Sequence, residues 1–119
     1  MATLNMIGTF DLVSSQIEKN VTKISAGNYA LGRLEDDNFI VLYVGRSDSD
    51  LKNRLISWVG KNAKYKKFKY SYADSFKAAF EKECNNYHDF GGKAKLDNEV
   101  HPDRPENSGW KCPRCKIFD

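Results

Sequence analysis

A glutamate in the second half of the chain falls where an apolar side chain is expected. Between residues 76 and 90, apolar side chains recur at helical intervals, and Glu83 lies in the middle of the face they form. A carboxylate directed at a protein core is costly unless it is paired or holds a cation. Three explanations follow: a side chain that bends out to reach solvent, an ion pair with an arginine at the core edge, such as Arg54, or a bound divalent metal ion.

Two tyrosines add to this acid. The segments on either side of the predicted turn Asp36-Asp37-Asn38 have strand-like composition and carry Tyr29 and Tyr43. If the hairpin register centres on Asp36, these tyrosines lie opposite each other on one face of the sheet. Tyrosines in strands are more often packing residues. Here they accompany an acid and an arginine, a set suited to phosphodiester chemistry, in which the acid holds a metal, the arginine offsets phosphate charge and a phenol orients water.

The remaining periodicity predicts the elements that position these groups. Residues 12–24 have helical spacing, and a second helix runs from a cap at Ser49 or Asp50 to about Gly60, with Arg54 beside its apolar stripe. Residues 68–72 alternate as in a half-exposed strand. Asp74 or Ser75 then caps the helix that carries Glu83.

The order of these features resembles a known family. Gly27-Asn28-Tyr29 and Tyr43-Val44-Gly45 stand where the GIY-YIG nuclease domain family has its two tripeptides. A short loop, the helix with Arg54, the acidic helix and Asn98 follow in the family's order, so the resemblance covers roughly residues 26–100. It implies an α/β fold of the α+β type, with a small mixed, mainly antiparallel three-stranded sheet flanked by helices.

The resemblance also implies an endonuclease that cleaves DNA with one divalent cation, Mg²⁺ or Mn²⁺. The residues carried over are Tyr29 for the attacking water, Tyr43 as its assistant, Arg54 for the phosphate, Glu83 for the metal with Glu81 as its rival, and Asn98 as a support. The helix after Arg54 continues Ile56-Ser57-Trp58 and lacks the histidine that many members have there. This departure motivates the alternative, a non-catalytic module that binds nucleic acid or a protein partner.

The last part of the chain holds all three prolines and no periodicity, and it requires an external staple. Cys112 and Cys115 form a Cys-x-x-Cys pair, and Cys84 and His88 lie one helical turn apart. These four residues form a candidate Cys3His zinc site, with His101 as the alternative imidazole. We therefore divide the chain into a helical extension (1–25), a GIY-YIG-like catalytic domain (26–100) and a Cys-containing tail packed on it (101–119).

The charge distribution indicates where DNA would bind. The formal net charge is only +3, but residues 60–70 contain five lysines and no acid. We predict phosphate contacts from Arg46 and from Lys61, Lys64, Lys66 and Lys67. No apolar run has the length of a membrane span and the N-terminus lacks a secretory pattern, so we expect a cytoplasmic protein without membrane contact.

Overall fold

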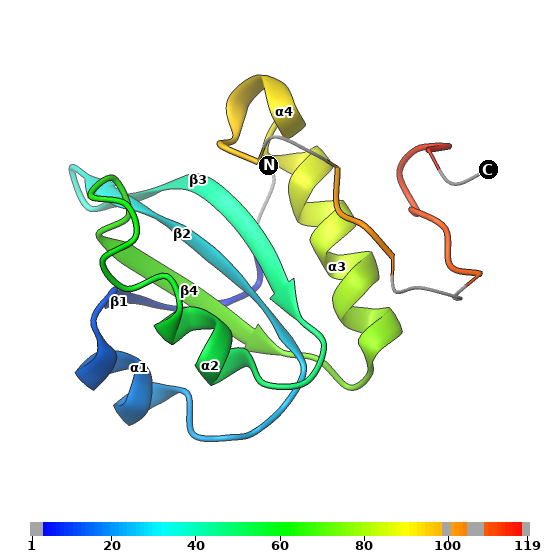
Figure 1. Cartoon of the computed structure of the whole chain (residues 1–119). Helices are drawn as coiled ribbons and strands as arrows, with labels where there is room; N and C mark the ends of the chain where they lie inside the picture. The colour runs from blue at the N-terminus through cyan, green and yellow to red at the C-terminus, as the bar shows by residue number, and fades with distance from the viewer. Residues whose placement is uncertain (1–3, 99–100, 105–108, 118–119) are drawn as a thin grey trace.

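The sheet has four strands, and every neighbouring pair is antiparallel. In the computed structural model, which describes residues 4–98, 101–104 and 109–117, the strands are β1 (Ile7–Asp11), β2 (Gly27–Glu35), β3 (Asn38–Ser47) and β4 (Lys67–Tyr72), in the order β1-β4-β2-β3 (Figure 1). The expected α+β class is confirmed, with four strands instead of three. The additional strand, β1, comes from a segment that we assigned to a helical extension. It is short and mostly exposed, so it lacks the alternation that marks a strand.

In the described part of the chain, four helices accompany the sheet: α1 (Ser14–Asn20), α2 (Leu51–Ile56), α3 (Phe76–Asp89) and α4 (Gly92–Lys95). The N-cap predictions are confirmed, because the Asp50 side chain accepts a hydrogen bond from the Asn53 amide and the Ser75 side chain accepts one from the Ala78 amide. The first two helices are shorter than their apolar periodicity suggested. Residues 57–61, beyond α2, continue as turns.

The helices cover opposite faces of the sheet. α1 and α2 bury one core, which includes Ile17, Leu55 and Phe68, whereas α3 packs on β2 and β3 from the other side over Ala30 and Val44. Figure 1 shows α1 and α2 next to each other and α3 alongside β3. β3 is an edge strand, so groups from α2 and α3 can meet around its open side.

The hairpin of β2 and β3 differs from the register that we expected. Its two turn residues, Asp36 and Asp37, both have positive φ (49° and 67°), as a tight two-residue turn requires. A register shift after Leu31 then pairs Leu31 with Tyr43 and Tyr29 with Gly45. The predicted direct pairing of Tyr29 with Tyr43 is therefore wrong. The two residues are diagonal neighbours on the same face, and their stacked rings have centroids 6.4 Å apart.

Candidate active site and candidate metal centre

A pocket of about 260 Å³ lies at the open edge of β3, between α2 and α3. It collects five of the six residues that we predicted as catalytic: Tyr29 from β2, Tyr43 from β3, Arg54 from α2, Glu83 from α3, and Asn98. The sixth, Glu81, lines a different pocket with Asn5 and Asn85, so it is separated from the tyrosines. Of the two glutamates of α3, Glu83 is the one that shares a pocket with the phenols.

The glycine of the second motif allows Tyr29 to enter this pocket. A Cβ atom at Gly45 would lie 2.4 Å from both Cζ and Oη of Tyr29, so only glycine leaves room for the ring. The Tyr29 hydroxyl accepts a hydrogen bond of 2.8 Å from the Trp58 indole N–H. Trp58 also packs against Tyr43, with ring centroids 4.7 Å apart. Gly45 and Trp58, which follows α2, thus hold the rings of Tyr29 and Tyr43 in position.

Both phenols stay protonated at neutral pH. Burial raises the pKa of Tyr29, and the neighbouring Tyr43 raises it further. Burial also raises the pKa of Tyr43, with a further contribution from the negative charge of Glu83. Each hydroxyl can therefore orient a water molecule or donate a hydrogen bond to a phosphate oxygen, whereas a phenolate is disfavoured.

Glu83 is directed inward, as its position on the helix predicted, and it is only 8% exposed. Its partner is Arg46, whose Nη1 atom donates to Glu83 Oε1 at 2.6 Å, so the alternative of an ion pair with an arginine is confirmed, with Arg46 in place of Arg54. Arg46 Nε also donates to Asp48 Oδ1 at 2.9 Å. Burial raises the pKa of Glu83 to about 7, although the positive charge of Arg46 opposes this. Burial lowers the pKa of Arg46, but Glu83 and Asp48 outweigh this effect and raise it overall.

Arg54 is the exposed cation of the pocket. It lines the same pocket, and its positive charge opposes the rise in the pKa values of Tyr29, Tyr43 and Glu83. Within residues 4–98, 101–104 and 109–117, no carboxylate forms an ion pair with it. Arg54 is therefore available to an incoming anion, whereas Arg46 is already engaged by two acids.

Asn98 has a structural position. Its Nδ2 atom donates to the carbonyl oxygen of Val44 at 2.8 Å, and its Oδ1 atom accepts from the Val44 amide at 3.1 Å. The Asp97 amide donates to the carbonyl oxygen of Leu42 at 2.7 Å. Residues 97 and 98 thus form hydrogen bonds with backbone groups on the outer edge of β3, next to Gly45. They support the pocket by holding that strand in place.

The lysines of residues 60–70 do not form a uniform free surface. Lys64 pairs with Asp97 at 2.9 Å, and Lys67 pairs with Asp11. Lys61 and Lys66 are exposed, and Lys61 shares a shallow depression with Arg54 and Trp58. Of the predicted lysine contacts, Lys61 is the one that continues the cationic surface from Arg54.

A second cluster of polar side chains joins the tail to α3. The ligand-type atoms of His88, His101, Cys112 and Cys115 all lie within 4.8 Å of one another, a group that can hold a metal ion. Cys84, which we predicted as a ligand, is not part of this group, and His101 takes its place. The Cys84 thiol is instead buried against Phe80 and Cys112, and burial raises its pKa, with a further contribution from a hydrogen bond to Cys112. Helical spacing correctly placed Cys84 and His88 on one side of α3. Only His88 belongs to the cluster, because the tail brings His101, Cys112 and Cys115 close to it.

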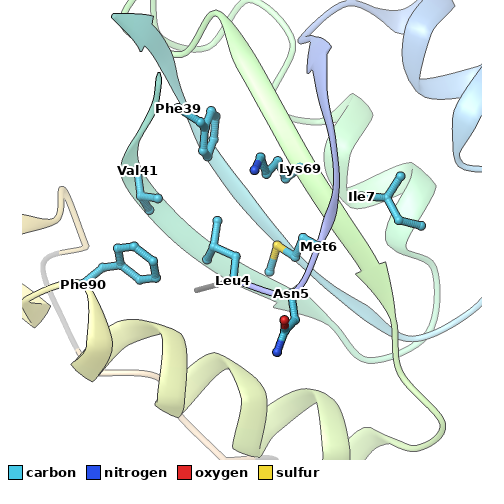
Figure 2. A pocket seen from close by; sticks show the side chains of 8 residues that line it. All are labelled: Leu4, Asn5, Met6, Ile7, Phe39, Val41, Lys69 and Phe90. Atoms are coloured by element: carbon cyan, nitrogen blue, oxygen red, sulfur yellow. The ribbon is translucent and has the colours of Figure 1, made fainter. Parts of the chain in front are cut away.

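The largest pocket in the described part of the chain has a different character. It measures about 650 Å³ and lies near the N-terminal segment, where Leu4 and Met6 lie between Lys69 and the more distant Phe90 (Figure 2). Phe39 and Val41 of β3 also line it, and Nζ of Lys69 lies 5.3 Å from the centroid of the Phe39 ring. Because no carboxylate lines it, it offers no site for a hydrolytic metal.

Searches of protein-family models, of curated proteins and of solved structures found no match to this chain. Among the described residues, no helix is long and apolar enough to cross a membrane. The functional assignment therefore depends on the geometry of the two sites themselves.

Proposed function

We propose that this chain is a metal-dependent endonuclease of the GIY-YIG type, which hydrolyses phosphodiester bonds in DNA. The observation that supports it is the meeting of Tyr29, Tyr43, Arg54 and Glu83, from four different elements, around one pocket of about 260 Å³. An inward acid, a free arginine and two neutral phenols suit phosphodiester hydrolysis, in which a metal ion, a cation for the phosphate and groups that orient water all contribute. The three free thiols fit a reducing compartment such as the cytoplasm.

The residues of the pocket fit a hard divalent cation. Glu83 is a buried carboxylate, and Asp48, which shares Arg46 with it, also lines the pocket. Carboxylate oxygens are the ligands that Mg²⁺ and Mn²⁺ prefer. Such an ion, held by Glu83, would supply Lewis-acid polarisation of a phosphate oxygen. Arg46 would then have to release Glu83, and this freed guanidinium group could turn to the phosphate.

The other pocket residues have complementary tasks. Arg54 is exposed and free of acids, so it can pair with the phosphate and offset the charge that grows in the transition state. Tyr29, held by Trp58 and seated on Gly45, can orient the attacking water. Tyr43 lies beside it and can donate to a phosphate oxygen or to that water. Asn98 holds β3 in place and does not need to touch the substrate.

The decisive experiment compares two acids on the same helix. Supercoiled plasmid is incubated with Mg²⁺ or Mn²⁺ and either wild-type protein, Glu83→Gln or Glu81→Gln. Because Glu81 lines a separate pocket, its variant should cleave like the wild type, whereas Glu83→Gln should lose at least about 100-fold in rate. Equal cleavage by both variants, or no cleavage by the wild type on linear, nicked and branched DNA, would reject the proposal.

A second candidate function uses the same surface without catalysis. Glu83 is already neutralised by Arg46, and the segment after Arg54 offers tryptophan where a histidine would provide a further proton-transfer group. A module that binds nucleic acid through Arg54 and Lys61, with a zinc-bound tail, is consistent with this. It predicts DNA binding that weakens steeply with salt and no cleavage by any metal. If DNA does not bind even at low salt, the result favours a module that binds a protein partner through this surface instead of nucleic acid.

A further inference from the structure

We propose that His88, His101, Cys112 and Cys115 bind one Zn²⁺ in a closed tetrahedral site, and that this ion holds residues 101–103 as one wall of the tyrosine and glutamate pocket. The zinc site stands independently of the nuclease assignment. Its effect on cleavage rests on that proposed function.

The spacing of the ligand atoms fits zinc. Zn–N bonds of about 2.0–2.1 Å and Zn–S bonds of about 2.3 Å at tetrahedral angles place two nitrogens roughly 3.3 Å apart, and a nitrogen and a sulfur roughly 3.6 Å apart. In the structure, Nε2 of His88 lies 3.2 Å from Nε2 of His101, and the latter lies 3.4 Å from Sγ of Cys115. With two sulfurs and two imidazoles, this ligand set favours zinc over Mg²⁺.

Backbone groups form hydrogen bonds with two of the four ligands, His101 and Cys112, in a way that favours cation binding. His101 Nδ1 lies 2.7 Å from the carbonyl oxygen of Pro102, an acceptor that requires the ring proton on Nδ1 and leaves the Nε2 lone pair facing the cluster. The Arg114 amide donates to Sγ of Cys112 at 3.4 Å, a hydrogen bond that stabilises a thiolate. No disulfide links Cys112 and Cys115, and both thiols are free. The hydrogen bonds around the four ligands thus suit a bound metal ion.

The tail needs such an ion to hold its position. Among residues 101–104 and 109–117, none belongs to a helix or strand, so regular backbone hydrogen bonding does not order them. Figure 1 shows the described part of this segment running alongside α3. It packs on α3 through Trp110, Cys112 and Cys115 against Phe80 and Cys84 and through His101 against Tyr87, and an ion pair joins Arg114 to Asp89. These contacts come from single side chains, and a structural zinc ion would add bonds that tie the segment to His88 of α3.

The same segment closes the proposed active site. His101, Pro102 and Asp103 line the pocket that contains Glu83, while His101 also belongs to the metal cluster. α3 carries both Glu83 and His88, so one helix joins the two sites. The tail reaches the pocket by a second route, since Trp110 packs on Phe80 and the Arg46 guanidinium group lies over that ring at 5.3 Å.

The first experiment measures zinc directly. Protein purified without chelator should contain about one zinc per chain by elemental analysis, and Cys115→Ser and His101→Ala should lose it. Cys84→Ala is the matched control, because this buried cysteine touches Cys112 but lies outside the ligand group. Circular dichroism checks that each variant is folded. Absence of zinc from the wild type even after reconstitution, or equal loss in Cys84→Ala, overturns the site.

The second experiment tests what the ion holds in place. Chelation should expose the tail to trypsin after Lys111 and Arg114, and it should speed amide hydrogen exchange in residues 101–104. Unchanged cleavage and exchange on removal of zinc would show that the ion does not order this wall. Both measurements remain informative if the protein cuts no DNA.

The third experiment separates the wall from the nuclease assignment. With Mg²⁺ in excess, zinc-free protein should cut plasmid more slowly than the zinc-bound form, and Cys84→Ala should match the wild type. Equal cutting with and without zinc would leave the nuclease assignment standing and remove the link between the two sites.

Discussion

The close contact between Gly45 and Tyr29 yields a quantitative test of the pocket geometry. In Gly45→Ala, the added methyl group would lie 2.4 Å from Cζ and Oη of Tyr29 and 2.9 Å from Cε1. Ordinary contacts between carbon atoms begin near 3.5 Å, so the ring must move by about 1 Å. Tyr29 is 2% exposed and its hydroxyl is bound to Trp58, so the movement disturbs a packed cluster.

The size of the effect follows from overpacking. Insertion of one methyl group into a packed core costs about 1–3 kcal/mol, which corresponds to a lower Tm by several degrees. A displacement of about 1 Å of a group that orients the reaction costs about 100-fold in rate. Gly45→Ala should therefore lose both stability and cleavage, and the loss of cleavage should persist well below the Tm.

The test of Gly45→Ala includes a control variant and a double-mutant cycle with Tyr29. Gly109→Ala is the matched control, because a Cβ at that position meets no atom within 4 Å in the described part of the chain apart from its chain neighbours, and it should behave like the wild type. In a Tyr29→Ala background, Gly45→Ala should cost much less, since the clashing ring is gone. Thermal unfolding measures stability and plasmid cleavage measures rate. If Gly45→Ala is as stable and active as Gly109→Ala, Tyr29 does not lie on Gly45 and the pocket is not built as we describe.

Three further predictions concern other parts of the pocket. Tyr29→Phe should abolish cleavage and cost about 1 kcal/mol in urea unfolding, because the Trp58 N–H loses its acceptor; retained cleavage would remove Tyr29 from the mechanism. Asn98→Ala should cost about 2–3 kcal/mol by the same measurement, because both Val44 hydrogen bonds are lost, and a neutral result would show that the edge strand does not need this brace. Mn²⁺ affinity, measured by calorimetry, should fall about tenfold from pH 8 to pH 6, because Glu83, with a pKa near 7, is mostly ionised at the higher pH and mostly neutral at the lower; the same pH dependence in Glu83→Gln would assign it to another group.

Local patterns in the sequence were sufficient for several features. The turn at Asp36-Asp37, the caps at Asp50 and Ser75, and the inward direction of Glu83 all depend on residues within a few positions of one another. Turn chemistry, capping and helical periodicity are short-range effects, so they can be recognised without a fold. The α+β class, in contrast, was what the resemblance to the GIY-YIG family implied.

Other features depend on contacts between distant segments. β1 forms because β4 offers it an edge, and its own residues carry no strong strand pattern. The two-residue turn pairs Glu35 with Asn38, which already displaces the expected register by one residue, and the shift after Leu31 displaces it by one more. A bulge of this kind leaves no mark in the composition. The nucleic-acid prediction for Lys64 and Lys67 overlooked acids far away in the chain that pair with them.

The sequence by itself determined which chemical groups this chain has and roughly which face of each element bears them. The reason is that the spacing of apolar residues within a single helix or strand indicates its buried face. Only the tertiary structure decided that Arg46 holds Glu83 and that His101 stands where Cys84 was expected. An ion pair or a metal cluster forms between whichever groups the packed elements bring within about 4 Å. That choice depends on how α3, β3 and the tail meet, which no single segment encodes.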